Sequence, residues 1–412
     1  MGSEGLKSPG RQGQDPLVWL APDRSDPCLA GLNASIAIYC VGGAVRDALM
    51  GDQGVDRDYL VVGARPEDLL RLGFKPVGKD FPVFLHPDSK NEYALARTER
   101  KTGGGYRGFE VHADPSVRLE DDLCRRDLSI NAMAVDEQGR LHDPHGGLED
   151  LQQKRLRHVS PAFREDPVRL LRLARFLSRW PEFQVSTDTL ALCAAMRDDG
   201  EVQSLVAERV WQELYKGLHE KAPGRMIGFL RTLGLLEPVL GLAEPQADSG
   251  LGLETRLNRA STLGLPAEVT AALLLAGAKG ALRDRLPKKV EEWIALMPGF
   301  SALERLLEAP TTWPEKLPAW ASRADVFRRP ERLGAMGLLG QFLLADQGQE
   351  TNGKLHKRWG LWMQLCDELS HLSVSAVAQS QSAKDSSTIR EAIEGYRQSF
   401  VHKRLAESTI ND

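Results

Sequence analysis

Apolar runs with the length and composition of β-strands occur in this chain only between Ser35 and about Asp150. There they alternate with turns and helical stretches, a pattern typical of a mixed sheet with helices. From Asp166 nearly to the end, apolar residues recur at helical spacing. We therefore expect an α+β protein in which helices alone follow the mixed part. Strands are predicted at 36–41, 59–62, 83–85 and 130–135, and helix breaks at Pro223, Pro266, Pro287 and Pro314.

A chain of 412 residues is too long for one compact core, so more than one domain is expected. Residues 1–35 are rich in Gly, Pro, Ser and Asp without periodicity, which predicts a poorly ordered extension. The strand-containing head is predicted at 36–150. A helical neck is expected at 151–240, and a helical body and tail at 241–412.

Several sequence features bear on the cellular compartment. No apolar run approaches the roughly 20 residues that a membrane helix needs. The N-terminal sequence has no apolar core of the kind found in secretory signals. The five cysteines are odd in number and widely scattered, which suggests neither a disulfide framework nor a zinc site. These features predict a cytoplasmic protein without a membrane association.

A local excess of positive charge lies in the middle of the chain, although the formal net charge is −4. Residues 151–180 hold eight Lys or Arg against two acids, a net charge of +6 in this window. A confined basic patch is typical of a site that binds an anionic ligand.

Two acids, Asp56 and Asp58, stand where a strand is predicted to begin. Residues two apart on a strand point to the same face, so the two carboxylates converge while Arg57 faces away. Converging acids repel unless a cation lies between them, and Mg²⁺ combines carboxylate oxygens with water and substrate phosphates. The alternative is a solvated turn before a strand, because the D-x-D pattern is common by chance.

The segment "IYCVGGAVRDALMG" predicts a strand, a turn at Gly42 and Gly43, and a short helix. Paired glycines permit unusual backbone angles and the close approach of a ligand. Amides at a helix start face an anion, and Arg46 in the first turn adds a charged fork. A plain strand-to-helix turn would explain the glycines but not Arg46. The third glycine of a dinucleotide-binding fingerprint is missing.

These two segments together resemble the nucleotidyltransferase superfamily that includes DNA polymerase beta. More closely, the sequence is similar to bacterial tRNA nucleotidyltransferases, the CCA-adding enzymes of the class shared by bacteria and eukaryotes. The resemblance is continuous from about Ile38 to Leu218 and weak beyond about residue 240. It rests on five motifs in order: "VGGAVRD", "DRD", "RRDLSINAMA", "DPHGGLEDL" and "EDPVRLLRLARF".

The resemblance implies that Asp56 and Asp58 hold catalytic Mg²⁺. The implied reaction is attack by a tRNA 3′-hydroxyl on the α-phosphate of CTP or ATP, with release of pyrophosphate. The implied partners are tRNA and the two nucleotides, without an obligatory protein partner. Glu92 is a candidate third carboxylate, and an exposed edge acid is an equally good interpretation of it.

The family's "RRDLSINAMA" motif contacts the triphosphate and the ribose, which implies this role for Arg126 and Asp127, with Asn131 supporting the loop. An acid that accepts a hydrogen bond from the 2′-hydroxyl would distinguish ribose from deoxyribose. Without the other motifs, a surface ion-pair cluster with Glu120, Asp121 and Asp122 would be the better interpretation.

In "EDPVRLLRLARFLSRW", Asp166 followed by proline predicts a helix start capped by the aspartate. Leu170, Leu173, Ala174 and Leu177 form its apolar face, and arginines fill the other. A merely solvated face usually mixes Lys and Glu, so an all-arginine face favours anion and base binding. The resemblance assigns base selection to Asp166 and Arg169, while Arg172 and Arg175 would hold the base stack or phosphates.

Other functions in the same class are a bacterial poly(A) polymerase and an enzyme that adds only CC or only A. Poly(A) polymerases usually end in a strongly basic tail, and the sequence RLAESTIND is not basic. A catalytically inactive RNA-binding relative would not need the Asp56/Asp58 pair. Many proteobacterial relatives carry an HD phosphohydrolase domain, but the comparable region of this chain, "LLLAGAKGALRDRL", contains no histidine.

Overall fold

The computed structural model describes residues 17–52, 56–77, 83–101, 109–112, 114–243, 252–346, 353–380 and 386–408. The chain forms two compact units. The first comprises Met1–Leu173 with Glu182–Val206, and the second comprises Ala174–Pro181 with Ala207–Asp412. The segment 151–240, expected to form a neck, is thus divided between the two units.

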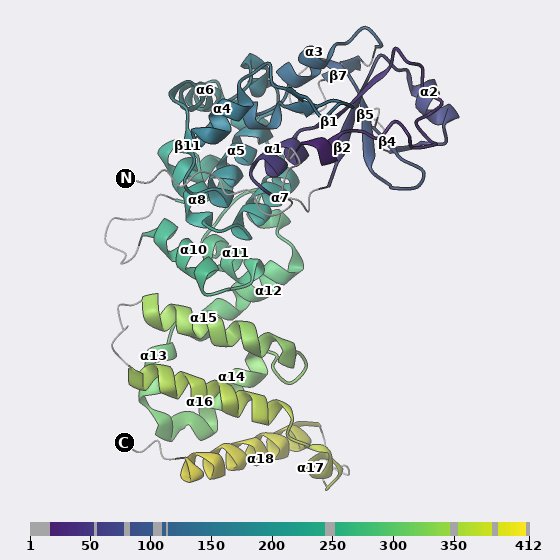
Figure 1. Ribbon diagram of the computed structural model, residues 1–412. Helices are drawn as coiled ribbons and strands as arrows, with labels where there is room; N and C mark the ends of the chain where they lie inside the picture. Colours follow the sequence, from purple (N-terminus) through teal and green to yellow (C-terminus); the bar gives the residue numbers. More distant parts are fainter. Residues whose placement is uncertain are drawn as a thin grey trace, which may run out of the picture. The chain divides into compact units, whose positions relative to one another are not determined.

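The first unit contains all the strands of the described residues. They are β1 (Ala37–Val41), β2 (Asp58–Val62), β3 (Lys75–Val77), β4 (Val83–Leu85), β5 (Glu92–Leu95), β6 (Thr98–Lys101), β7 (Phe109–His112), β8 (Ala134–Val135), β9 (Leu141–His142), β10 (Arg155–Leu156) and β11 (Gln184–Val185). Seven of them form a mixed sheet in the order β3-β4-β5-β2-β1-β8-β9. Strands β2 and β5 are parallel and the other neighbours in this sheet are antiparallel; β1, β2, β5 and β4 can be followed side by side in Figure 1.

The predicted strands at 36–41, 59–62 and 83–85 are confirmed as β1, β2 and β4. The strand predicted at 130–135 is wrong for most of its length, since only its last two residues pair in the sheet. Ser129–Asn131 instead form a 3-10 turn, η2, that turns the Asn131 side chain toward buried charges. Strands also continue past Leu151, because β10 and β11 form a short parallel pair.

The first unit also contains several short helices. Those of the first unit are α1 (Gly43–Leu49), α2 (Pro66–Arg71), α3 (Leu119–Cys124), α4 (Gly147–Gln152) and α6 (Thr187–Asp198), with the 3-10 helices η1 (Val18–Leu20), η3 (Pro161–Glu165) and η4 (Glu201–Ser204). Helix α5 (Val168–Arg179) begins in the first unit and ends in the second.

The two faces of the sheet bury different clusters because successive strand residues point to opposite sides. On β2, Tyr59 and Val61 pack into the larger cluster, together with Ile38 and Cys40 of β1. Leu60 packs into the smaller cluster on the other side. By the same alternation, the Asp58 side chain lies on the face of the sheet that contains Leu60.

The N-terminal segment differs from the expected poorly ordered extension over residues 17–35. Leu17, Leu20, Leu29 and Leu32 are buried in the larger core cluster. The prediction failed because these leucines lie among Gly, Pro and Asp without a regular period, so composition concealed them. Residues 1–16 lie outside the described part of the chain.

Helices are the only regular secondary structure in the described residues of the second unit. Its further helices are α7 (Ala207–Leu218), α8 (Pro223–Thr232), α9 (Leu236–Leu240), α10 (Leu253–Thr262), α11 (Ala267–Leu275), α12 (Lys288–Leu296), α13 (Leu303–Glu308), α14 (Trp313–Arg323), α15 (Leu333–Asp346), α16 (Gly353–Ser370), α17 (Ser375–Ser380) and α18 (Ser386–Glu407), with η5 (Arg283–Arg285), η6 (Met297–Phe300), η7 (Pro310–Thr312) and η8 (Pro330–Arg332). The four prolines expected to break helices each lie at a helix start, at α8, α11, α12 and α14.

Four tryptophans form the centre of the helical core around α14 and α16. Trp313 meets Trp362 edge to face with 5.1 Å between ring centroids, and Trp320 contacts Trp359 and Trp362 in the same way. Edge-to-face contacts of this kind hold aromatic rings in defined orientations. Among the helices of the described residues, none combines the length and the apolar character that crossing a membrane requires.

Candidate active site

The glycine turn and the paired acids of the sequence lie at the same end of two neighbouring strands. Asp58 is the first residue of β2 and lies opposite Val41, the last residue of β1, which directly precedes Gly42. The sheet register therefore brings the turn and the carboxylate together, as the order of the motifs predicts. Asp56 lies two residues before the strand, and both acids are exposed at the surface.

A third carboxylate stands beside Asp58. Glu92, the first residue of β5, is its direct partner in the parallel pairing of β2 and β5. Although Asp58 reaches the surface, the surrounding protein reduces the hydration of its carboxyl and raises its pKa. Glu92 and Asp56 raise this pKa further, whereas Arg126 acts in the opposite direction. A cation bound near these acids would relieve the repulsion that raises this pKa.

Gly42 adopts a backbone conformation that other residues rarely adopt, with φ of 71° and ψ of −130°. Its N–H donates to the Met133 carbonyl at 3.2 Å. A Cβ at this position would lie 2.8 Å from Nη1 of Arg126. The absence of a side chain thus lets the Arg126 guanidinium approach the turn, next to the carboxylates.

Arg46 is a buried side chain with defined partners. It is 5% exposed, its Nε donates to Asp47 at 2.8 Å, and its Nη1 donates to the side-chain oxygen of Asn131. The Arg46 guanidinium, which was expected to contact phosphates, is therefore bound by Asp47 and Asn131. In this structure its visible effect is to fix the start of α1 to the 129–131 turn.

Arg125 and Arg126 share a carboxylate, Asp122, which the sequence alone would place in a surface ion-pair cluster. Asp122 is fully buried, 2.7 Å from Arg125 Nη2 and 3.3 Å from Arg126 Nη2. Burial alone would raise its pKa, but the two guanidinium groups outweigh that effect and lower it. The sequence could have indicated this contact, because Asp122 stands three and four residues before the two arginines that follow α3.

Asp127 connects the turn to helix α5. Its Oδ1 accepts from Asn131 Nδ2 at 2.9 Å and its Oδ2 accepts from Arg172 Nε at 2.8 Å. Burial would raise the pKa of Asp127, but Arg172 and the Asn131 hydrogen bond hold it well below its usual range. Arg172, Asp127, Asn131 and Arg46 therefore form one continuous chain of charge-assisted contacts.

The predicted helix start at Asp166 is confirmed. Asp166 Oδ1 accepts from the Val168 N–H at 3.1 Å, and the Arg169 N–H donates to the Asp166 carbonyl at 2.9 Å. The Arg169 side chain follows in the first turn and donates from Nη1 to the Ala162 carbonyl at 2.9 Å. The two side chains proposed to read a base are both partly exposed and held by local hydrogen bonds.

Arg175 lies further along α5, in the second unit. Its Nε is 2.6 Å from Glu213 of α7, and both side chains are nearly buried. The guanidinium also lies 4.7 Å from the centre of the Phe176 ring. The arginine face of α5 is therefore less open than its sequence suggests, since Arg172 and Arg175 each have a carboxylate partner.

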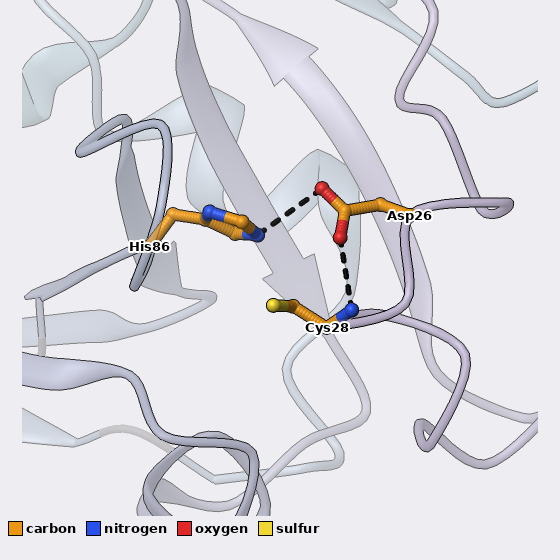
Figure 2. Close-up of side chains that lie close together, drawn as sticks. All are labelled: Asp26, Cys28 and His86. Atoms are coloured by element: carbon orange, nitrogen blue, oxygen red, sulfur yellow. Dashed lines mark hydrogen bonds and ion pairs between the residues drawn. The ribbon is translucent and has the colours of Figure 1, made fainter.

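One group among the described residues combines side chains of metal-ligand type: Asp26, Cys28 and His86 (Figure 2). Nε2 of His86 lies 3.2 Å from Asp26. Its Nδ1 accepts from the backbone N–H groups of Asp88 and Ser89, at 3.2 and 3.1 Å. A neutral imidazole then carries its proton on Nε2 and has no lone pair there for a metal. These contacts favour a histidine–carboxylate pair over a metal site.

Two family descriptions match the chain. "Poly A polymerase head domain" matches residues 38–157, which include the turn, the carboxylates and Arg126. "Probable RNA and SrmB- binding site of polymerase A" matches residues 182–250.

Curated relatives and solved structures give longer matches. The "Multifunctional CCA protein" of Aromatoleum aromaticum is 40% identical over 413 residues, covering 90% of this chain and 99% of its own. The protein of the same name from Methylobacillus flagellatus is 55% identical over 249 residues, which cover 58% of this chain and 61% of that protein. The fold is similar to that of the Bacillus stearothermophilus CCA-adding enzyme in complex with CTP. The TM-score is 0.64 at 24% identity, over 90% of this chain and 89% of that one.

Proposed function

The chain belongs to the family of bacterial CCA-adding enzymes, and from this membership we propose that it completes the 3′ end of tRNA. The reaction is the addition of CCA from CTP and ATP, without a nucleic-acid template and with release of pyrophosphate. The observation that carries the proposal is the register that sets Asp58 beside Glu92 and opposite the residue before the glycine turn. The proposed location is the cytoplasm, where tRNA is matured.

Nucleotidyltransferases of this family depend on metal ions in general. We propose Mg²⁺ as the metal and Asp56 and Asp58 as the side chains that hold it, with Glu92 as a third carboxylate. Their oxygens are the ligands that Mg²⁺ prefers, and the mutual repulsion that affects the pKa of Asp58 would be relieved by a cation. When bound, such ions lower the pKa of the attacking hydroxyl and neutralise the triphosphate.

The remaining site residues bind and orient the nucleotide. Gly42 and Gly43 let the triphosphate approach the backbone, and Arg126 adds positive charge there. Asp127 is placed near the sugar, but its two oxygens already accept from Asn131 and Arg172. A ribose hydroxyl would therefore share an oxygen with these donors. Arg46 and Arg172 affect ligand binding indirectly, because they position Asn131 and Asp127.

The activity is tested with purified protein, tRNA that lacks its CCA end, and labelled CTP and ATP added separately and together. Full addition requires both nucleotides and lengthens the tRNA by the complete triplet. An enzyme adding only CC would not use ATP, one adding only A would need tRNA that already ends in CC, and a poly(A) polymerase would produce long tracts from ATP alone. No extension of any of these substrates would contradict the proposal.

Replacing Gly42 by alanine should impair nucleotide addition much more than it impairs folding. The positive φ costs a non-glycine residue on the order of 1–3 kcal/mol, and the new Cβ would displace the Arg126 guanidinium from the turn. Gly73→Ala is the matched control, because Gly73 also has a positive φ, 86°, but no atom within 4 Å of an added Cβ. We expect both variants to melt at a lower temperature and only Gly42→Ala to raise the KM for CTP. Equal KM values in the two variants would contradict the role of the turn.

The protein should show no metal-dependent phosphatase or 2′,3′-cyclic phosphodiesterase activity. The segment comparable to the HD motif, residues 273–286, begins at the end of α11, includes η5 and contains no histidine. Among the described residues of the second unit, no three His, Cys, Asp or Glu side chains gather within metal-binding distance. The measurement is turnover of both substrate classes with nickel, manganese or cobalt added. Turnover that stays with the protein through every purification step would refute the prediction.

A further inference from the structure

An N-terminal arm, residues 17–36, precedes the segment 38–157 that matches the head-domain family. The arm is part of the core, since its buried leucines and Ile36 join the cluster that contains Tyr59 and Val61. Asp58 belongs to the opposite face of β2, with Leu60. The arm therefore covers the side of the catalytic strand that faces away from the carboxylates.

The start of β2 is weakly held by the sheet itself. The pairings of β2 with β1 and β5 begin at Asp58, so the described ladder contains neither Asp56 nor Arg57. A backbone segment without ladder hydrogen bonds depends on its side chains for a fixed position. One of the two proposed metal ligands thus lies on a segment that needs another support.

Arg57 supplies that support through the arm. Its guanidinium lies 5.0 Å from the centre of the Trp19 ring, within the range of a cation–π contact. It also interacts with Tyr59, the next residue on the same face, and partly offsets the rise in the pKa of Tyr59 that burial causes. Trp19 is partly buried and packs against the core cluster. The residue between the two acids is therefore clamped between the arm and the sheet.

The clamp continues across the sheet and returns to the arm. Tyr59 stacks on Tyr93 with 4.6 Å between ring centroids, and the Tyr93 ring centre is 5.9 Å from that of His86. His86 then meets Asp26 of the arm at 3.2 Å, as Figure 2 shows. The arm holds both ends of this row of side chains.

A further contact fixes the arm between these two ends. Arg24 Nε donates to Glu137 at 2.8 Å, and its Nη2 donates to the Ile36 carbonyl. The same Glu137 oxygen lies 3.3 Å from the N–H of Ile38 in β1. The arm thus has three separated contacts next to the sheet: with Arg57 before β2, with His86 after β4 and with Glu137 between β8 and β9.

We propose that the N-terminal arm is a positioning element for nucleotide transfer, in which Trp19 fixes Arg57 and thereby the spacing of the Asp56 and Asp58 carboxylates. The role extends the proposed function and rests on it. Trp19 and Arg57 are positioning residues, because neither faces the substrate. Loss of the clamp should let Asp56 move, which lowers the affinity for the metal and the rate of transfer but leaves tRNA binding unchanged.

The experiment compares Trp19→Ala, Trp19→Phe and Val18→Ala with the wild-type protein. In Trp19→Ala we expect kcat for CTP addition to fall by about tenfold or more, as small misplacements of reacting groups do. The KM for CTP and the Kd for tRNA should be unchanged. Mn²⁺ binding, followed by electron paramagnetic resonance, should be weaker in the same variant. Trp19→Phe keeps an aromatic face and should restore both properties, while Val18→Ala, at an exposed neighbour, should match the wild type.

Arg57→Met and the Trp19→Ala/Arg57→Met double variant test the contact itself. If Arg57 acts through Trp19, the double variant loses no more than the worse single variant. A raised KM for CTP in Arg57→Met would mean that Arg57 contacts the nucleotide and would overturn the proposal. A folded Trp19→Ala protein with the kcat and the Mn²⁺ binding of the wild type would also overturn the proposal. If the wild-type protein adds no nucleotide, the proposed function fails, and Mn²⁺ binding by the variants still decides the role of the arm.

Discussion

Replacing Asp58 by alanine should abolish nucleotide addition while tRNA affinity stays nearly unchanged, and Asp56→Ala should do the same. The two carboxylates are proposed to hold metal, not RNA, so their loss removes stabilisation of the transferring phosphate. Metal-ion catalysis is worth several kcal/mol, which corresponds to a rate loss of about a thousandfold or more. The measurement is kcat for CTP and ATP addition together with the Kd for tRNA.

The matched control is Glu67→Ala, which removes an exposed acid from α2 elsewhere in the first unit. It should leave addition and tRNA binding at the wild-type level. Asp58→Asn separates charge from shape, since it keeps the size of the side chain and should still be inactive. More than a few per cent of wild-type turnover in both Asp56→Ala and Asp58→Ala would exclude them as the catalytic pair.

The part of the site that could be predicted from the sequence lies in local patterns. The pairing of Asp58 with Val41 follows once the neighbouring strand ends in a glycine turn, whereas Asp56, expected on the same strand face, lies before the strand. The helix start at Asp166 is equally local, since an aspartate followed by proline determines where the first turn begins. Such features need only the nearest residues in the chain.

The contacts that could not be predicted join residues far apart in sequence. Arg172 and Asp127 are 45 residues apart, and Arg175 and Glu213 are 38 apart. Helical periodicity shows which arginines share a face of α5 but not which acids will be packed against it. For the same reason, a face expected to be open to anions is partly neutralised by carboxylates in the folded protein.

Asn131 shows how hydrogen bonding to buried charged groups can override strand propensity. The run from Ile130 to Val135 has the composition of a strand, yet residues 129–131 form a tight turn. That turn sets the Asn131 amide between Asp127 and Arg46, where it donates to one and accepts from the other. A strand there would have removed one hydrogen-bond partner from each of two buried charges, which costs more than a few ladder hydrogen bonds.

The incoming base is predicted to be selected by Asp166 and Arg169. Cytosine and adenine both present an exocyclic amino donor beside a ring-nitrogen acceptor, whereas uracil and guanine present a carbonyl and an N–H at these places. A carboxylate can only accept and a guanidinium can only donate at neutral pH. One Asp/Arg pair therefore suits both C and A and leaves the groups of U and G without partners.

The geometry of α5 supports this role. The cap to Val168 orients the Asp166 carboxylate, and the bond to the Ala162 carbonyl orients the Arg169 guanidinium. Groups that are already oriented lose little freedom when they bind a base. Asp127 ties the same helix to the turn through Arg172, which sets the distance from the base-reading pair to the carboxylates.

The test measures incorporation of UTP and GTP against CTP and ATP in Asp166→Ala and Arg169→Ala. An unpaired buried group costs on the order of 1–3 kcal/mol, so the preference for C and A should fall by at least about tenfold in each variant. Arg179→Ala removes an arginine from the far end of the same helix and should lower neither the preference nor the rate to this extent. A residue that selects a base must change the ratio between bases when it is removed. If both pair variants keep the wild-type preference and lose only overall rate, Asp166 and Arg169 therefore serve only to build the helix start.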